Sequence, residues 1–240
     1  MKQFLPTLTL IATAAFVLSP YVTDPFSGFD PQRFPVPQTD PPVQPAGYAF
    51  AIWGVIYLWL AVSAITGVYA RRQDPAWHRV QAPLILSLGP GAFWLWIAGF
   101  SPIGATALIF WMLFFAIRAF LRAPRRDRWV LQAPVGLYAG WLTAAAHVSL
   151  GVALGGYGLV SPQWAAIIAL AGATALAIWV LASRPDSPEY GVAVIWALVG
   201  VLVANSGGTT QIITVTWIAL LLVVLAAIRN LWAGQNRTAL

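Results

Sequence analysis

The sequence predicts an all-α integral membrane protein, a polytopic helix bundle of about eight transmembrane helices with both termini in the cytoplasm. Three observations support this class. Hydrophobic residues make up 60% of the 240 residues and charged residues only 8%, whereas a soluble domain usually carries about 25% charged residues. The apolar residues fall into runs close to the roughly 20 residues that cross a bilayer. The basic residues lie in short clusters between these runs.

The apolar runs divide the chain into eight expected spans. The division between the third and fourth spans depends on Ser101 and Pro102, which supply the break between two adjoining apolar runs. The first run also has features of a cleaved signal peptide, since Lys2 precedes it. We expect it to be retained, because no small-residue cleavage site follows it. The expected spans are 5–22, 47–70, 81–99, 101–121, 129–153, 162–182, 189–205 and 209–232.

The distribution of basic residues predicts the orientation of these spans. With the N-terminus in the cytoplasm, the cytoplasmic segments hold 12 of the 13 basic residues, and only Arg33 lies outside. The positive-inside rule requires this asymmetry, so an even number of spans follows. The same clustering accounts for the net charge of +6 without a nucleic-acid partner. We therefore expect a lipid bilayer, and no nucleic acid, as the partner.

The external segment 23–46 is rich in proline. Proline removes amide donors and stiffens the chain, so we expect an ordered or extended cap without a helix. This cap is either a stiff external linker or a lid over a cavity that opens to the outer side. Its prolines are Pro25, Pro31, Pro35, Pro37, Pro41, Pro42 and Pro45.

The spans lack the residues that most membrane chemistry needs. No span core contains Asp, Glu or Lys, which argues against a proton- or sodium-coupled transporter. The chain has no cysteine and two histidines, so we predict neither an enzyme nor a resident metal. His147 shares a helix face with small residues, which predicts a packed histidine that hydrogen bonds across a helix interface. The alternative for His147 is an axial ligand of a haem or chlorophyll metal.

Aromatic residues are enriched, with 13 tryptophans in the chain. Several at span ends fit the interfacial belt. Others form stripes at helical spacing in the second, third and fifth spans. Ordinary helix packing explains each aromatic alone, but together the stripes predict an aromatic-walled pocket for a flat or apolar ligand. The predicted ligand-binding residues are Phe50, Trp53, Tyr57, Gly91, Trp94, Tyr138, Trp141, Ala145 and Ser149.

Three segments that carry these stripes resemble motifs of the translocator protein family, whose bacterial members are called tryptophan-rich sensory proteins (TspO/MBR). Residues 45–57 read PAGYAFAIWGVIY and resemble the second-helix signature. Residues 83–94 read PLILSLGPGAFW and look like the third-helix motif, with Gly91 at a family Asn position. Residues 134–145 read PVGLYAGWLTAA and resemble the fifth-helix motif, with Ser149 at a second Asn position.

The resemblance implies a five-helix core over residues 1–153 and three added helices over 154–240, as in a longer, eight-span branch of the family. It implies binding of porphyrins, sterol-like molecules or other apolar aromatics beneath the first external loop, in a bacterial inner membrane. Loss of both Asn positions removes amide groups, which favours a more apolar ligand such as a sterol or carotenoid.

Two functional classes follow from this resemblance. The first is a ligand-binding protein for tetrapyrroles or related apolar molecules, acting in sensing, regulation or transport. The second is a structural or assembly subunit of a larger, pigment-binding membrane complex. A weaker third is a facilitator without ion coupling. A homodimer, or docking into a larger membrane complex, is compatible with the small-residue faces around Gly136 and Gly140.

Overall fold

A computed structural model describes the backbone of residues 2–238 and the side chains of residues 3–232. This part of the chain is helical and contains no strand. Short turns flank the helices: η1 (Lys2–Phe4), η2 (Ser19–Tyr21), η3 (Pro31–Arg33), η4 (Gly47–Ala51), η5 (Arg125–Asp127) and the π-helical η6 (Arg128–Gln132). The helices are α1 (Leu5–Leu18), α2 (Ile52–Tyr69), α3 (Pro75–Gly91), α4 (Trp94–Ala98), α5 (Pro102–Arg122), α6 (Ala133–Gly156), α7 (Pro162–Ser183), α8 (Glu189–Ala204) and α9 (Thr210–Thr238).

The helices confirm a polytopic helical membrane protein. Five helical stretches are long and apolar enough to cross a membrane: 47–69, 102–122, 125–156, 162–183 and 210–232. Two further apolar helices, Leu5–Tyr21 and α8, are shorter. Large apolar side chains such as Leu58, Trp217 and Leu221 are more than half exposed, as expected for surfaces that face lipid. The division into residues 1–153 and 154–240 stays a prediction.

The third expected span, 81–99, differs from the observed helices at both ends. Helix α3 begins six residues earlier, at Pro75, because the Asp74 carboxylate accepts a hydrogen bond from the amide of Ala76 and caps its first turn. The helix then ends at Gly91, and α4 resumes at Trp94. The expected break at Ser101 is confirmed, because its hydroxyl caps α5 by accepting from the Gly104 amide at 3.1 Å.

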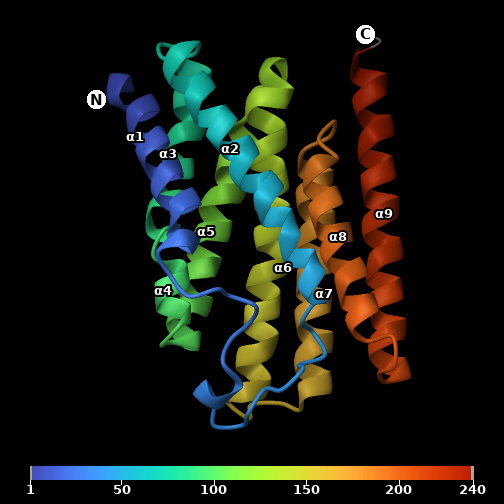
Figure 1. The fold of residues 1–240 in the computed structure, drawn as a ribbon. Helices are drawn as coiled ribbons and strands as arrows, with labels where there is room; N and C mark the ends of the chain where they lie inside the picture. The colour runs from blue at the N-terminus through green and yellow to red at the C-terminus, as the bar shows by residue number, and fades with distance from the viewer. Residues whose placement is uncertain (1, 239–240) are drawn as a thin grey trace.

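The two ends of the bundle differ in character. The N- and C-terminal ends of the described chain lie at one end, and the proline-rich loop (residues 23–46) lies at the other (Figure 1). Helices α2, α5 and α7 end, and α3, α6 and α8 begin, at the first end. The arginine-bearing connections between them therefore gather there, as the even number of expected spans requires.

An ion pair ties two of these connections together. Arg71, which follows α2, donates two hydrogen bonds to Asp127 at 3.1 and 3.0 Å. The indole N–H of Trp77, on α3, donates a third to the same carboxylate at 2.7 Å. The Arg71 guanidinium holds the pKa of the Asp127 carboxyl below its usual 3.8, against the opposing effect of desolvation. The pair thus clamps the connection between α5 and α6 to α2 and α3.

Helix α6 forms the centre of the bundle and is buried over most of its length. It packs against α5, α7 and α8. At Gly140 the approach of α8 is so close that a Cβ would lie 2.1 Å from the carbonyl oxygen of Tyr190. At Gly136 a Cβ would lie 2.8 Å from the Phe120 ring. Both small residues therefore pack within the bundle.

Candidate ligand-binding cavity

A cavity of about 240 Å³ lies between the proline-rich loop and the helices beneath it. Its lining comes from α2, α4, α5 and α6, from η2, η4 and the loop, and from single residues of α1, α3 and α8. The walls are mainly apolar, as in most small-molecule sites. The aromatic side chains that line it are Phe16, Phe26, Phe29, Phe50, Trp53, Tyr57, Trp94 and Trp141.

Eight of the nine residues predicted from the sequence line this one cavity. The exception is Tyr138, which is fully buried behind the wall. Its hydroxyl lies 2.9 Å from the Ser87 hydroxyl, and its ring packs edge-on against Phe16 at 5.7 Å. Tyr138 therefore supports the wall from behind. The residues that line the cavity as predicted are Phe50, Trp53, Tyr57, Gly91, Trp94, Trp141, Ala145 and Ser149.

The aromatic rings on α2 and α6 brace one another. The Trp53 and Tyr57 rings stack, with centroids 5.2 Å apart and an interplanar angle of 21°. Trp141 meets Trp53 edge-on at 6.1 Å and Phe50 edge-on at the same distance. Such pairs are each worth about 0.5–1.5 kcal/mol beyond the apolar area they bury. The rings are therefore held in fixed orientations around the cavity.

Gly91, where the sequence resemblance placed a family Asn, lies beside apolar side chains in the cavity wall. A Cβ on Gly91 would lie 2.8 Å from the Met112 methyl carbon and 3.2 Å from the Phe16 ring. Apolar side chains from α1 and α5 thus fill the space beside this glycine. The cavity is consequently more apolar at this point than an amide would make it.

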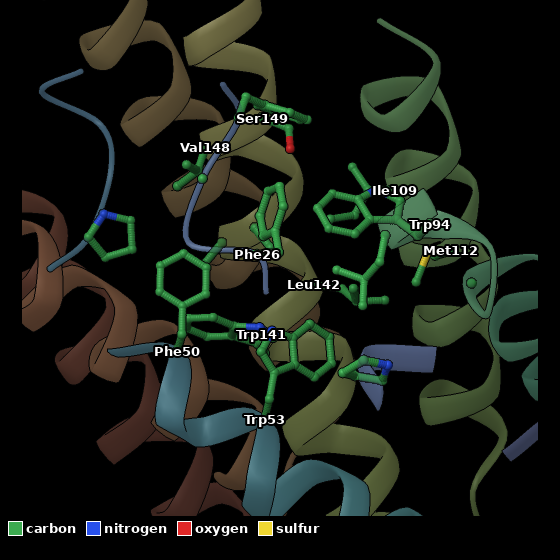
Figure 2. Close-up of a pocket in the computed structure, with 18 of the residues that line it drawn as sticks. Phe26, Phe50, Trp53, Trp94, Ile109, Met112, Trp141, Leu142, Val148 and Ser149 are labelled. Atoms are coloured by element: carbon green, nitrogen blue, oxygen red, sulfur yellow. The ribbon is translucent and has the colours of Figure 1, made fainter. Parts of the chain in front are cut away.

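Sequence reasoning missed the aromatic residues that the loop and α1 contribute. Phe26 extends from the loop into the group formed by Trp94, Val148 and Ser149 (Figure 2). Its ring packs edge-on against Trp94 at 4.9 Å. The loop has no helical periodicity, so no stripe marks Phe26 or Phe29. The residues of other elements that were missed include Phe16, Ile109, Met112, Leu142 and Ala197.

The proline-rich loop lies along a line of glycines on α6. Its residues Val43, Gln38 and Phe34 sit against Gly151, Gly155 and Gly156 respectively, each within 3.1 Å of where a Cβ would stand. The Val36 amide donates to the carbonyl of Gly156 at 2.9 Å. These contacts seat the middle of the loop on the end of α6.

Helix α8 holds the last part of the loop. The Ala46 amide donates to the Gly200 carbonyl at 3.0 Å. The side-chain amide of Asn205 donates to the Pro42 carbonyl at 2.9 Å. The loop is therefore an ordered cover over the cavity, fastened to both α6 and α8.

Polar groups are few in the cavity wall. The Trp141 indole N–H is buried and has no hydrogen-bond partner among the described residues. An unmatched buried donor costs about 1–3 kcal/mol, so this group is a candidate contact for an acceptor. Asp24, an exposed residue of the loop, is the one described lining residue that is charged at neutral pH.

His147 is packed, but its hydrogen bond differs from the prediction. Its Nδ1 lies 2.7 Å from the Thr143 carbonyl oxygen, one turn earlier on α6, so the bond stays within the helix. Its ring faces Gly172 of α7, where a Cβ would lie 2.9 Å from the imidazole. Close packing against that glycine leaves the backbone of α6 as the partner of Nδ1. His147 does not line the large cavity. Its alternative role as an axial ligand stays a prediction.

Comparison with known proteins identifies the family. The model of the family described as TSPO-like protein matches residues 8–229, from α1 into α9. Searches of curated proteins and of solved structures each returned no match. The family match supports a general role in ligand binding or sensing at a membrane. Because the matched range covers most of the chain, this protein belongs to the TSPO-like protein family.

Proposed function

We propose that the protein binds a flat apolar ligand, a porphyrin or a related molecule such as a sterol or carotenoid, in the cavity beneath the proline-rich loop. Its role would be sensing, regulation or transport, in the inner membrane of a bacterium. The observation that carries the proposal is the convergence of eight aromatic side chains on one mainly apolar cavity. Burial of a ligand between such rings gains both apolar area and ring–ring contact.

The size of the cavity implies that the loop moves when a large ligand enters. The volume of about 240 Å³ lies below the roughly 300–1,000 Å³ typical of ligand sites. A porphyrin therefore needs residues 24–29 and 44–45, which line the cavity from the loop, to move outward. The loop meets α6 and α8 through three hydrogen bonds and through buried side chains such as Phe34 and Val43. The rest of the wall consists mainly of helices that pack along their length, so the loop is the part of the wall that can open at least cost.

Titration of the detergent-solubilised protein with protoporphyrin IX dimethyl ester tests this proposal. The ester is an uncharged porphyrin, and its Soret band reports binding directly. We expect a saturable change with one site per chain. The double variant Trp53→Ala/Trp141→Ala should weaken binding by about ten- to hundredfold, because two ring contacts of about 0.5–1.5 kcal/mol each are lost.

A matched control separates the cavity from the lipid-facing surface. Trp179, on α7, is 54% exposed and does not line the cavity. Trp179→Ala should leave the dissociation constant unchanged. Equal affinity in the wild type and in the Trp53/Trp141 double variant, with saturation in both, would show that the ester binds elsewhere.

A further inference from the structure

The described residues that line the cavity carry negative charge and no positive charge. Asp24 is the single charged residue among the described lining residues, and no Lys, Arg or His lines the cavity. Arg33, the one basic residue of the proline-rich loop, pairs with Asp30 and does not line it. A ligand in the cavity therefore meets a carboxylate and no cation.

The aromatic rings in the cavity wall also favour a cationic ligand over an anionic one. The face of an aromatic ring carries negative charge density and attracts cations. Phe26, two residues after Asp24, packs edge-on against both Trp94 at 4.9 Å and Phe29 at 5.7 Å. The loop side of the cavity thus combines aromatic rings with one acidic side chain, a combination that suits an ammonium or other cationic group.

From this arrangement we infer that the site selects its ligand by charge: it takes an apolar aromatic body that is uncharged or, preferably, carries a cationic group at the Asp24 end, and it discriminates against carboxylates. The inference rests on the proposed function, since it names the ligand class of the same cavity. It also narrows that function, because a porphyrin with free propionates is then a poorer ligand than its uncharged ester.

Burial in this cavity costs a carboxylate more free energy than it costs an ammonium group. A carboxylate placed in this cavity would lose water and could gain neutral donors such as the Trp141 indole N–H, but it would gain no cationic partner among the described lining residues, so its burial is unfavourable. It would also face the Asp24 carboxylate. An ammonium would lose water too, but it gains the ring faces and the Asp24 charge in exchange. Because Asp24 is exposed, its own share is of the size of a surface ion pair, about 0.2–1 kcal/mol.

Three probes with one naphthalene ring system test the inference: trimethyl(2-naphthyl)ammonium, its uncharged isostere 2-tert-butylnaphthalene, and the smaller anion 2-naphthoate. Their dissociation constants are measured by competition with protoporphyrin IX dimethyl ester, in one nonionic detergent at low ionic strength. We expect the cation to bind about three- to tenfold tighter than the isostere, and the anion to bind weakest. The Trp53→Ala/Trp141→Ala variant measures nonspecific partition into the micelle.

A pair of charge-matched variants assigns the effect to Asp24. Asp24→Asn should reduce the cation-to-anion affinity ratio by at least about twofold. Asp40→Asn removes the same charge from the same loop at a residue that does not line the cavity, and should leave the ratio unchanged. A ratio near one in the wild type, or equal ratios in the two variants, would overturn the inference. If no probe and no porphyrin ester saturates the protein, the proposed function itself fails.

Discussion

The ring of Phe34 in the proline-rich loop lies directly against the backbone of Gly156 at the end of α6. A Cβ on Gly156 would come within 2.3 Å of the Phe34 Cδ1 atom. The ring itself is only 5% exposed. The absence of a side chain at Gly156 is therefore a condition for the seated position of the loop.

Gly156→Ala should unseat the loop without unfolding the bundle. The added methyl group forces the Phe34 ring to move, and overpacking of this kind typically costs about 1–3 kcal/mol. Hydrogen exchange followed by mass spectrometry should show faster exchange in residues 23–46 and unchanged exchange in α5 and α7. Gly54→Ala is the control, because a Cβ there meets nothing within 4 Å. Unchanged exchange in the loop would contradict the contact.

Gly140→Ala should destabilise the whole bundle, because the methyl group meets the backbone of α8 at Tyr190, which cannot rotate away. We expect a loss of at least about 1–3 kcal/mol, visible as a lower apparent Tm in detergent. Size-exclusion chromatography with light scattering should show an unchanged oligomeric state. A variant with normal Tm and altered oligomeric state would place Gly140 between protomers instead.

The Asp127 clamp predicts a dependence of stability on acid. Its folded pKa lies below the usual 3.8, so the ionised form favours the folded state. That contribution is complete above about pH 5, declines as the pH falls past the unfolded value of 3.8, and disappears as the pH falls through the lower folded pKa. Asp127→Asn should lower the apparent Tm at pH 7, because the Arg71 and Trp77 hydrogen bonds lose their charged acceptor.

The Asp127→Asn variant should also flatten the pH profile. Between pH 5 and pH 3 the wild type should lose more of its apparent Tm than the variant does. Asp40→Asn, in the loop at the opposite end, serves as the control. Parallel profiles for the wild type and Asp127→Asn would mean that the clamp contributes nothing to stability.

Much of the fold could be predicted because a bilayer imposes its own pattern on a sequence. The apolar runs match the observed limits closely in α5, α7 and α8, and in α2 once the preceding turn η4 is included. The expected start of α3 was too late, because His78 and Arg79 in its first turns interrupt the apolar run from which the span was predicted. The cap at Asp74 extends the helix beyond the apolar run.

The site could be predicted only where it lies on helices. The spacing of Trp53, Tyr57, Trp141 and Ala145 identifies a face, and the cavity lies on that face. Helical spacing does not show, however, whether a side chain reaches the cavity surface or is covered by another helix. Tyr138 does not reach it, because Phe16 of α1 packs against its ring on the cavity side. Neither the approach of α1 nor the path of the loop is encoded in a local pattern.

Ligand binding with the loop locked shut tests whether the loop must open for a ligand to reach the cavity. The chain has no cysteine, so an engineered pair has no competing thiol. A Cβ on Gly151 would lie 3.1 Å from the Val43 Cγ1 methyl carbon. In Val43→Cys a sulfur can stand near that methyl position, which makes Val43→Cys/Gly151→Cys a candidate disulfide. Protoporphyrin IX dimethyl ester is then added before and after reduction. We expect no saturable binding to the oxidised protein and restored binding after reduction with dithiothreitol. Equal rates and affinities in the two states would contradict opening of this loop as the way in which the ligand enters the cavity.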